Sequence, residues 1–132
     1  MKKKYVFDAG VISLYFAGRE DVKTFFNKIF KGTAEGYICE VNLAEYYYKA
    51  IRKIGREAAE IRFLSIRSKI NVVSPEMELT REAAKIKAKY EKLISLADAY
   101  AIALTKKVKG ILLTTDSKIR DLKEVETILI KI

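Results

Sequence analysis

Short apolar runs recur along the sequence and constrain its fold more than any other feature. Four of the five are continuous rather than alternating apolar runs, which is typical of strands buried on both faces of a parallel sheet. The five runs are Tyr5–Phe7, Gly36–Cys39, Ile70–Val73, Gly110–Thr114 and Thr127–Ile130. The sequence therefore predicts five strands in a mostly parallel sheet.

Longer segments with apolar residues at helical spacing separate these runs. They are Val11–Ala17, Asp21–Phe30, Val41–Ile54, Arg56–Ser68, Leu79–Ile94 and Leu96–Thr105. Strands that alternate with helices predict an α/β fold, here a three-layer α/β/α sandwich with a mostly parallel central sheet. A chain of 132 residues buries about two-thirds of its surface around one core, so we expect a single domain over residues 1–132.

The chain contains no histidine and only one cysteine, Cys39. The lack of histidine removes the Ser-His-Asp and Cys-His nucleophile pairs and the commonest transition-metal ligand. A single cysteine excludes an internal disulfide and a cysteine-rich zinc site, and it indicates a reducing compartment. Any catalysis must therefore use carboxylates, lysine, arginine, tyrosine, hydroxyl groups or a metal ion held by oxygen atoms.

The amino terminus resembles a signal peptide only superficially. Asp8 interrupts the apolar run that follows Lys2–Lys4, and no stretch approaches about 18 uncharged apolar residues. We therefore expect a cytoplasmic protein without membrane association. The formal charge of +9, from 26 Lys and Arg against 17 Asp and Glu, favours polyanionic partners, with nucleic acid ahead of membranes.

Four acidic residues lie at the ends of predicted strands or among apolar residues, where a carboxylate is unusual. Asp8 follows the first predicted strand and Asp116 comes shortly after the fourth, while Asp98 is the only charge in an apolar run. Glu45 is flanked by apolar and aromatic residues. Each has a purely structural explanation. Asp8 and Asp116 could cap helices, Asp98 could form a capping box with the serine three residues before it, and Glu45 could pair with the lysine four residues after it.

The predicted topology also allows these acids to converge. Ligands bind beyond the carboxyl ends of the strands in parallel α/β sheets, and Asp8 and Asp116 reach the same edge if their strands are neighbours. Helices that begin near that edge would bring Glu45 and Asp98 to it. Converging carboxylates repel one another unless a divalent cation neutralises them, and an all-oxygen site selects Mg²⁺ or Mn²⁺ over zinc. Such a site suits phosphodiester hydrolysis by metal-activated water.

Basic residues close to these acids in the sequence are candidates for RNA contacts. Lys49, Arg52 and Lys53 lie in the same predicted helix as Glu45, and Lys118 comes two residues after the last of the four acids. Together they could hold phosphate groups around an acidic pocket, with a salt-dependent and largely sequence-independent affinity.

Three short motifs, in this order along the chain, resemble the PIN domain. They are Tyr5–Ile12, Leu96–Ala103 and Leu112–Asp116, and Glu45 lies between the first two. The small size of the chain resembles the VapC toxins of bacterial and archaeal toxin-antitoxin pairs. This resemblance implies a Mg²⁺- or Mn²⁺-dependent endoribonuclease that cleaves RNA, forms a homodimer and is neutralised by a cognate antitoxin protein.

The resemblance also implies roles for particular residues. The acidic residues that map onto the metal-binding carboxylates of the family are Asp8, Glu45, Asp98 and Asp116. Thr114 falls where the family usually has a hydroxyl group that supports the site. Family members often carry Ser, Thr or Asn two residues after the first aspartate, where this chain has Gly10. We expect this departure to change the orientation of Asp8 or of a water molecule, and so the rate of the reaction rather than its identity.

Two other classes of function remain open from the sequence. One is a non-catalytic RNA-binding or antitoxin-binding module with a PIN-like fold, whose acids only cap helices. The other is a phospho-acceptor receiver domain, a second α/β fold with an acidic metal site. A receiver domain needs its acceptor aspartate at the end of the middle strand, where this chain has Val73, Ser74 and Pro75.

Overall fold

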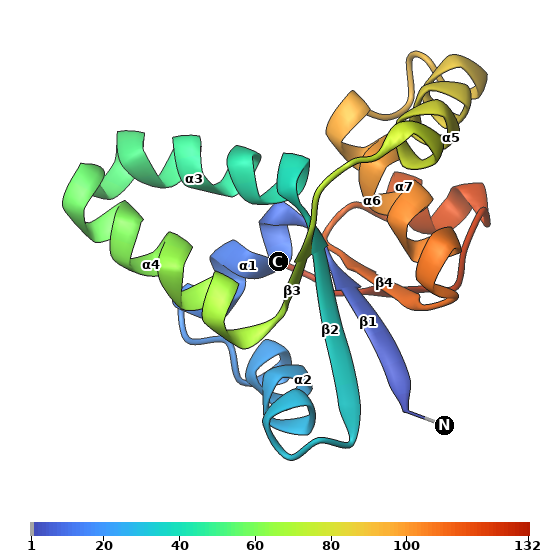
Figure 1. Cartoon of the computed structure of the whole chain (residues 1–132). Coiled ribbons are helices and arrows are strands. Elements are labelled where there is room, and N and C mark those ends of the chain that lie inside the picture. Colours follow the sequence, from blue (N-terminus) through green and yellow to red (C-terminus); the bar gives the residue numbers. More distant parts are fainter. Residues whose placement is uncertain (1) are drawn as a thin grey trace.

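A computed structural model describes residues 2–132 and shows a three-layer α/β/α architecture (Figure 1). The strands are β1 (Lys3–Phe7), β2 (Ala34–Cys39), β3 (Asn71–Val73), β4 (Ile111–Thr114) and β5 (Thr127–Leu129). The helices are α1 (Ala9–Phe16), α2 (Glu20–Phe30), α3 (Glu40–Ile54), α4 (Arg56–Lys69), α5 (Met77–Lys89), α6 (Leu96–Val108) and α7 (Ser117–Leu122). None of the helices in this part of the chain is both long enough and apolar enough to cross a membrane. The predicted fold class is confirmed.

The central sheet is parallel throughout, and its strands lie in the order β3-β2-β1-β4-β5. In the pairing of β1 with β4, Phe7 lies opposite Leu113. The residues that follow this pair, Asp8 just after β1 and Thr114 at the end of β4, therefore lie at the same place on the carboxyl edge. This register brings together two segments that are far apart in the sequence.

The strand order also tests the hypothesis that the chain is a receiver domain. Receiver domains have the flavodoxin-like order 2-1-3-4-5, in which the third strand is central. In this chain β3 lies at one edge of the sheet and β1 lies at its centre. The receiver-domain hypothesis is therefore wrong.

Both faces of the sheet are covered by helices. Tyr5 and Phe7 point into the core cluster beneath α1 to α4, and Val6 points into the cluster beneath α5, α6 and α7. In Figure 1 the first four helices lie to the left of the sheet and α5 to α7 lie to its right. A strand buried on both faces needs apolar residues at successive positions, which explains the continuous apolar runs in the sequence.

The helix predicted over residues 79–94 has different ends in the structure. It begins earlier because the Glu76 carboxylate caps its first turn, accepting backbone N–H groups at 2.7 and 3.0 Å. It stops at Lys89, and the chain then turns back. The Lys87 ammonium donates to the carbonyl oxygen of Ile94 at 2.8 Å and so stabilises this turn. Helical spacing of apolar residues continues past the true end of the helix and could not reveal this.

Candidate active site

Asp8 lies at the centre of the carboxyl edge, where β1 ends and α1 begins. Its side chain is buried, with 6% of the residue exposed. Oδ1 accepts the backbone N–H of Val11 at 2.8 Å, and Oδ2 accepts the hydroxyl of Thr114 at 2.5 Å. Asp8 is therefore the N-cap of α1, as its structural explanation predicted. Its second oxygen is committed to a residue from another strand.

Burial raises the pKa of the Asp8 carboxyl from 3.8 to about 6. The hydrogen bonds from Thr114 and Val11 act in the opposite direction, and the nearby charge of Asp98 adds to the increase. A carboxylate in this position is costly to ionise without a neighbouring positive charge. A cation beside Asp8 would therefore be held with a favourable electrostatic energy.

Thr114 connects Asp8 to the loop that follows β4. The residue is fully buried. Its hydroxyl donates to Asp8 and accepts the backbone N–H of Asp116 at 3.1 Å. One side chain thus uses both its donor and its acceptor to hold two of the predicted site residues.

Asp98 forms the predicted capping box at the start of α6. Its Oδ2 accepts the backbone N–H of Ser95, and the Ser95 hydroxyl accepts the backbone N–H of Asp98, both at 3.0 Å. The same carboxylate lies close enough to Asp8 for its charge to raise the pKa of Asp8. The capping role and proximity to the site therefore coexist.

Asp116 and Glu45 also make the contacts that their structural explanations predicted. Asp116 caps α7, because its Oδ1 accepts the backbone N–H of Lys118 at 2.9 Å. Glu45 lies 3.7 Å from the ammonium of Lys49, one turn further along α3. Within residues 2–132, no three acidic or cysteine side chains are grouped closely enough to hold a metal ion in this arrangement. The structure brings Asp8, Asp98 and Asp116 to one edge and pairs Glu45 with a lysine.

Asn42 is a buried residue of this region that sequence reasoning missed. It lies in the first turn of α3, three residues before Glu45, and is 1% exposed. Its Nδ2 donates to the carbonyl oxygen of Ala97 at 2.9 Å, which ties the start of α3 to the residue before Asp98. Its Oδ1 is buried without a hydrogen-bond partner in the described part of the chain. An amide among the apolar residues at the start of a helix was the signal that could have found it.

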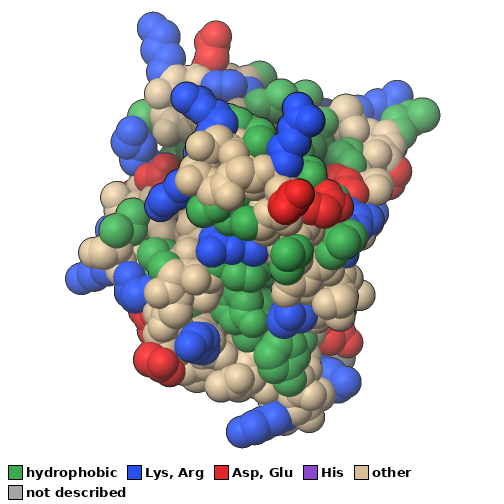
Figure 2. Space-filling view, turned by 90° about the vertical axis from the view of Figure 1, so that its left-hand side faces the viewer, with side chains coloured by type: hydrophobic (Ala, Val, Ile, Leu, Met, Phe, Trp, Pro, Cys, Tyr) green, Lys and Arg blue, Asp and Glu red, His purple; other side chains and the backbone are tan. Residues whose placement is uncertain are grey.

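A groove with a basic rim lies between α1 and the α3–α4 hairpin. Its volume is about 240 Å³, and its lining consists of Ser13, Phe16, Ala17, Tyr46, Lys49, Ala50, Lys53, Ile54 and Arg62. The lining includes three basic side chains and no acidic one, and the guanidinium of Arg62 lies over the ring of Phe16. Figure 2 shows the side of the molecule formed by these helices, with apolar side chains at its centre and Lys and Arg around them.

The predicted RNA contacts are divided between two places. Lys49 and Lys53 line the groove. Arg52 is exposed in the last turn of α3 but does not line the groove, and Lys118 is exposed in the first turn of α7, beside Asp116. The basic residues therefore lie on both sides of the acidic edge rather than in one patch.

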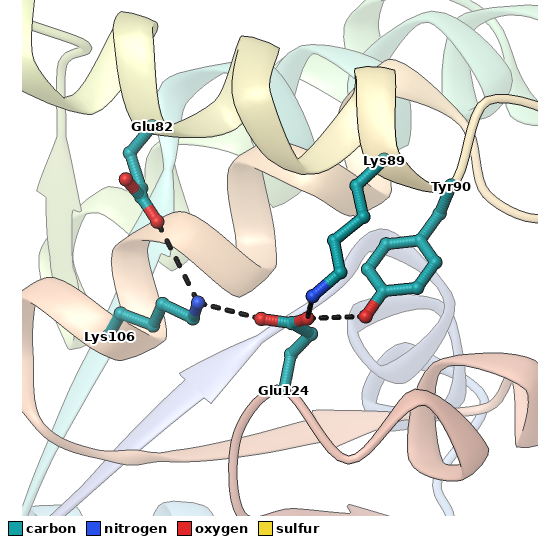
Figure 3. Close-up of polar contacts among 5 residues, drawn as sticks. All are labelled: Glu82, Lys89, Tyr90, Lys106 and Glu124. Atoms are coloured by element: carbon teal, nitrogen blue, oxygen red, sulfur yellow. Dashed lines mark hydrogen bonds and ion pairs between the residues drawn. The ribbon is translucent and has the colours of Figure 1, made fainter.

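A network of ion pairs and hydrogen bonds stabilises the C-terminal end of α6, which is remote from Asp98 (Figure 3). Glu124 lies in the segment after α7. Its carboxylate accepts hydrogen bonds from the ammonium of Lys106 at 2.7 Å, from the hydroxyl of Tyr90 and from the ammonium of Lys89 at 3.0 Å. Lys106 also lies 3.7 Å from Glu82 of α5. These hydrogen bonds, that of Lys106 first, lower the pKa of Glu124 to about 2. The network joins α5 and α6 to the segment that follows β4 and α7.

A parallel sheet with acidic residues along its carboxyl edge places the chain among the α/β proteins that bind ligands at this edge. Comparison with known families shows which family it belongs to. The model of the PIN domain family matches residues 5–125, so the chain belongs to the PIN domain family. No curated protein matches the sequence at a significant level.

Solved structures share this fold over nearly the whole chain. VapBC2 of Rickettsia felis, bound to a DNA fragment from its promoter, has 12% sequence identity and a TM-score of 0.81, covering 96% of this chain and 98% of that one. DNA-bound VapBC of Salmonella typhimurium has 14% identity and a TM-score of 0.75, covering 97% and 98%. VapC20 of Mycobacterium tuberculosis, a toxin that cleaves the sarcin-ricin loop, has 19% identity and a TM-score of 0.70, covering 94% and 98%. At these identities the similarity establishes the fold.

Proposed function

We propose that this chain is a Mg²⁺- or Mn²⁺-dependent endoribonuclease and the toxin of a toxin-antitoxin pair. The observation that carries the proposal is the buried Asp8 carboxylate, held by Thr114 at the edge where Asp98 and Asp116 also lie. A buried carboxylate near other acids is unfavourable unless a cation is bound. Membership of the PIN domain family and the similarity to VapC structures support the same function.

The donor atoms of the site suit a hard divalent cation. Asp8, Asp98 and Asp116 offer only carboxylate oxygens, which Mg²⁺ and Mn²⁺ prefer. Asp98 and Asp116 each use one oxygen to cap a helix, Oδ2 and Oδ1 respectively, which leaves the second oxygen of each for a ligand. Glu45 would join them by leaving its ion pair with Lys49. When bound, the cation supplies the activation of water and the neutralisation of charge that phosphodiester hydrolysis needs.

The residues of the chain itself bind the RNA and orient the carboxylates of the site. Thr114 fixes the direction of the Asp8 carboxylate, and Asn42 holds the helix of Glu45 against the helix of Asp98. The phosphates of RNA would be bound by the basic residues on both sides of the acidic edge, which are Lys49, Arg52, Lys53 and Lys118. Their exposure predicts an affinity that falls as salt concentration rises.

The proposed partners are a cognate antitoxin and a second copy of the chain. The groove offers apolar surface with a basic rim, which suits an antitoxin segment that carries apolar and acidic residues. Exposed apolar side chains on α4, Ile61 at 71% and Leu64 at 56%, support a further protein contact, and we propose a homodimer. We place the protein in the cytoplasm and away from membranes.

A non-catalytic binding module is the second candidate, and one observation favours it. Asp8, Asp98 and Asp116 all accept backbone N–H groups at helix starts, so each has a structural reason to be present. Under this alternative the chain binds RNA or an antitoxin without cleaving RNA. Binding of a divalent cation would then not be required.

Asp98 is the residue at which the two functions make opposite predictions. Asp98→Asn keeps an oxygen that can accept the Ser95 N–H, but it removes the charge. Ser95→Ala is the matched control, because it breaks the same capping box and leaves the carboxylate in place, at a cost of about 1 kcal/mol in stability. We expect Asp98→Asn to abolish cleavage of a single-stranded RNA in Mn²⁺ while melting near the wild-type temperature. Ser95→Ala should melt lower and still cleave. Cleavage by Asp98→Asn, or by the wild type in EDTA, would refute a metal-dependent nuclease with Asp98 as a ligand. A wild type that binds RNA but does not cleave it in Mn²⁺ would favour the binding module.

A further inference from the structure

Gly10 and Thr115 share one small space beside Asp8. A Cβ atom built on Gly10 would lie 2.6 Å from Thr115 Oγ1 and 3.3 Å from Thr115 Cγ2, and both distances are shorter than ordinary contacts. The same Cβ would lie 3.5 Å from Asp8 Oδ1. The Thr115 side chain therefore occupies the place that any side chain at position 10 would enter.

The backbone does not explain why position 10 is glycine. The glycines with positive φ in the described chain are Gly18, Gly32 and Gly55, so Gly10 has a conformation open to other residues. Glycine inside a helix is also unfavourable relative to alanine. What Gly10 provides is the space that Thr115 fills.

The Thr115 hydroxyl borders the space that lies next to Asp8 Oδ1. Thr114 donates to Oδ2, whereas the shared space lies next to Oδ1. Thr115 is only partly buried, whereas Asp8 is buried. The backbone amide of Thr115 also helps to offset the raised pKa of Asp8. Thr114 thus contacts one oxygen of Asp8, and the space that Thr115 shares with Gly10 lies next to the other oxygen.

We propose that Thr115 is a positioning residue of the metal site, and that its hydroxyl takes the place of a side chain at position 10. It orients the Oδ1 side of Asp8, where the lack of a side chain at position 10 leaves space for the Thr115 hydroxyl. This inference rests on the proposed function. It explains how a hydroxyl can lie beside the space next to Asp8 Oδ1 although position 10 has no side chain.

The test compares four variants with the wild type. Thr115→Val replaces the hydroxyl with a methyl group of similar size, and Thr115→Ser keeps the hydroxyl. Gly10→Ser introduces the clash, and Gly10→Ser with Thr115→Ala moves the hydroxyl to position 10. The readouts are the Mn²⁺ dissociation constant from the spectrum of free Mn²⁺, the melting temperature in EDTA, and kcat and KM for RNA cleavage.

The expected results follow from the shared space. Thr115→Val should weaken Mn²⁺ binding by about 10- to 100-fold and lower kcat rather than raise KM, whereas Thr115→Ser should stay near the wild type. Gly10→Ser should melt about 5 °C lower in EDTA because of overpacking. Adding Thr115→Ala should restore both the melting temperature and most of the Mn²⁺ affinity, so the two changes are not additive.

Several outcomes overturn the inference. One is that Thr115→Val binds Mn²⁺ as tightly as the wild type does. Thr115→Ala is measured as well, in case the valine variant does not fold. Another is a Gly10→Ser variant whose melting temperature equals that of the wild type. A wild-type protein that neither binds Mn²⁺ nor cleaves RNA overturns the proposed function, and this inference with it. A wild type that binds and cleaves, with an unaffected Thr115→Val, overturns this inference alone.

Discussion

The hydroxyl of Thr114 donates to Oδ2 of Asp8 at 2.5 Å, across a separation of 106 residues in the sequence. The contact exists because β1 and β4 are neighbours in the register that sets Phe7 opposite Leu113. The same hydroxyl accepts the N–H of Asp116. The orientation of two candidate ligands therefore depends on one buried oxygen atom.

Thr114→Val is expected to damage both stability and metal binding. It leaves a buried carboxylate oxygen without its donor, which costs about 1–3 kcal/mol in the free energy of unfolding. It also frees Asp8 to rotate, so Mn²⁺ affinity should fall by about 10- to 100-fold. Urea denaturation and Mn²⁺ titration measure the two effects.

Thr105→Val is the control for this change. Thr105 is also buried, and its hydroxyl donates to the Ala101 carbonyl at 2.8 Å within α6. The variant should lose some stability and keep its Mn²⁺ affinity. If Thr114→Val keeps its Mn²⁺ affinity too, then Thr114 is a structural residue only.

The metal-free protein should lose stability as pH rises through the titration of Asp8. The pKa of Asp8 is about 6 in the folded protein against an ordinary value of 3.8, so the folded state holds the proton more tightly than the unfolded chain. This contribution is complete below pH 3.8 and is lost as pH rises to about 6, a change of about 3 kcal/mol.

Asp8→Asn tests this prediction because it removes the titrating group. In EDTA at pH 7 we expect the variant to be more stable than the wild type, and the difference to vanish near pH 4. Urea denaturation at a series of pH values measures it. A wild type at least as stable as Asp8→Asn at pH 7 would show that Asp8 is not destabilised by burial.

Glu124 should give the opposite dependence on pH. Its pKa is lowered from 4.5 to about 2, so its contribution to stability is present above pH 4.5 and is lost as pH falls toward 2. Glu124→Gln removes the charge that three donors share, and it should cost about 2 kcal/mol at pH 7. Its acid denaturation should be shallower than that of the wild type. Because the network lies at the far end of α6, Mn²⁺ affinity should not change, and a large loss would place Glu124 in the site.

The sequence was sufficient for the five strands, for the carboxyl edge and for all the described helices except α7, but not for the contacts between side chains. Continuous apolar runs predicted the parallel strands, because burial on both faces favours apolar residues at successive positions of a strand. The position of Asp8 after such a run predicted its place at the carboxyl edge. The space shared by Gly10 and Thr115 could not be predicted, since it depends on the distance between side chains more than one hundred residues apart. The single hydrogen bond that the Asn42 side-chain amide donates to the Ala97 carbonyl had no periodic signal either.

The ion pair between Lys49 and Glu45 gives the last prediction. Both side chains are partly exposed, at 60% and 30%, and they are 3.7 Å apart, so the pair contributes at most about 1 kcal/mol to stability. If Glu45 is a metal ligand, Lys49 competes with the cation for it. Lys49→Met should therefore tighten Mn²⁺ binding by about fivefold, which corresponds to about 1 kcal/mol. It should also weaken RNA binding and reduce the salt dependence of that binding by about one charge.

Lys53→Met separates the two roles of Lys49. Lys53 lines the same groove one turn further along α3, while Glu45 pairs with Lys49. The Lys53 variant should weaken RNA binding to a similar extent and leave Mn²⁺ affinity at the wild-type value. Filter binding of RNA at several salt concentrations and titration with Mn²⁺ distinguish the variants. If the two variants bind Mn²⁺ equally, Lys49 does not compete with the cation, and Glu45 would have to be removed from the proposed ligands, which would leave the site to the three aspartates.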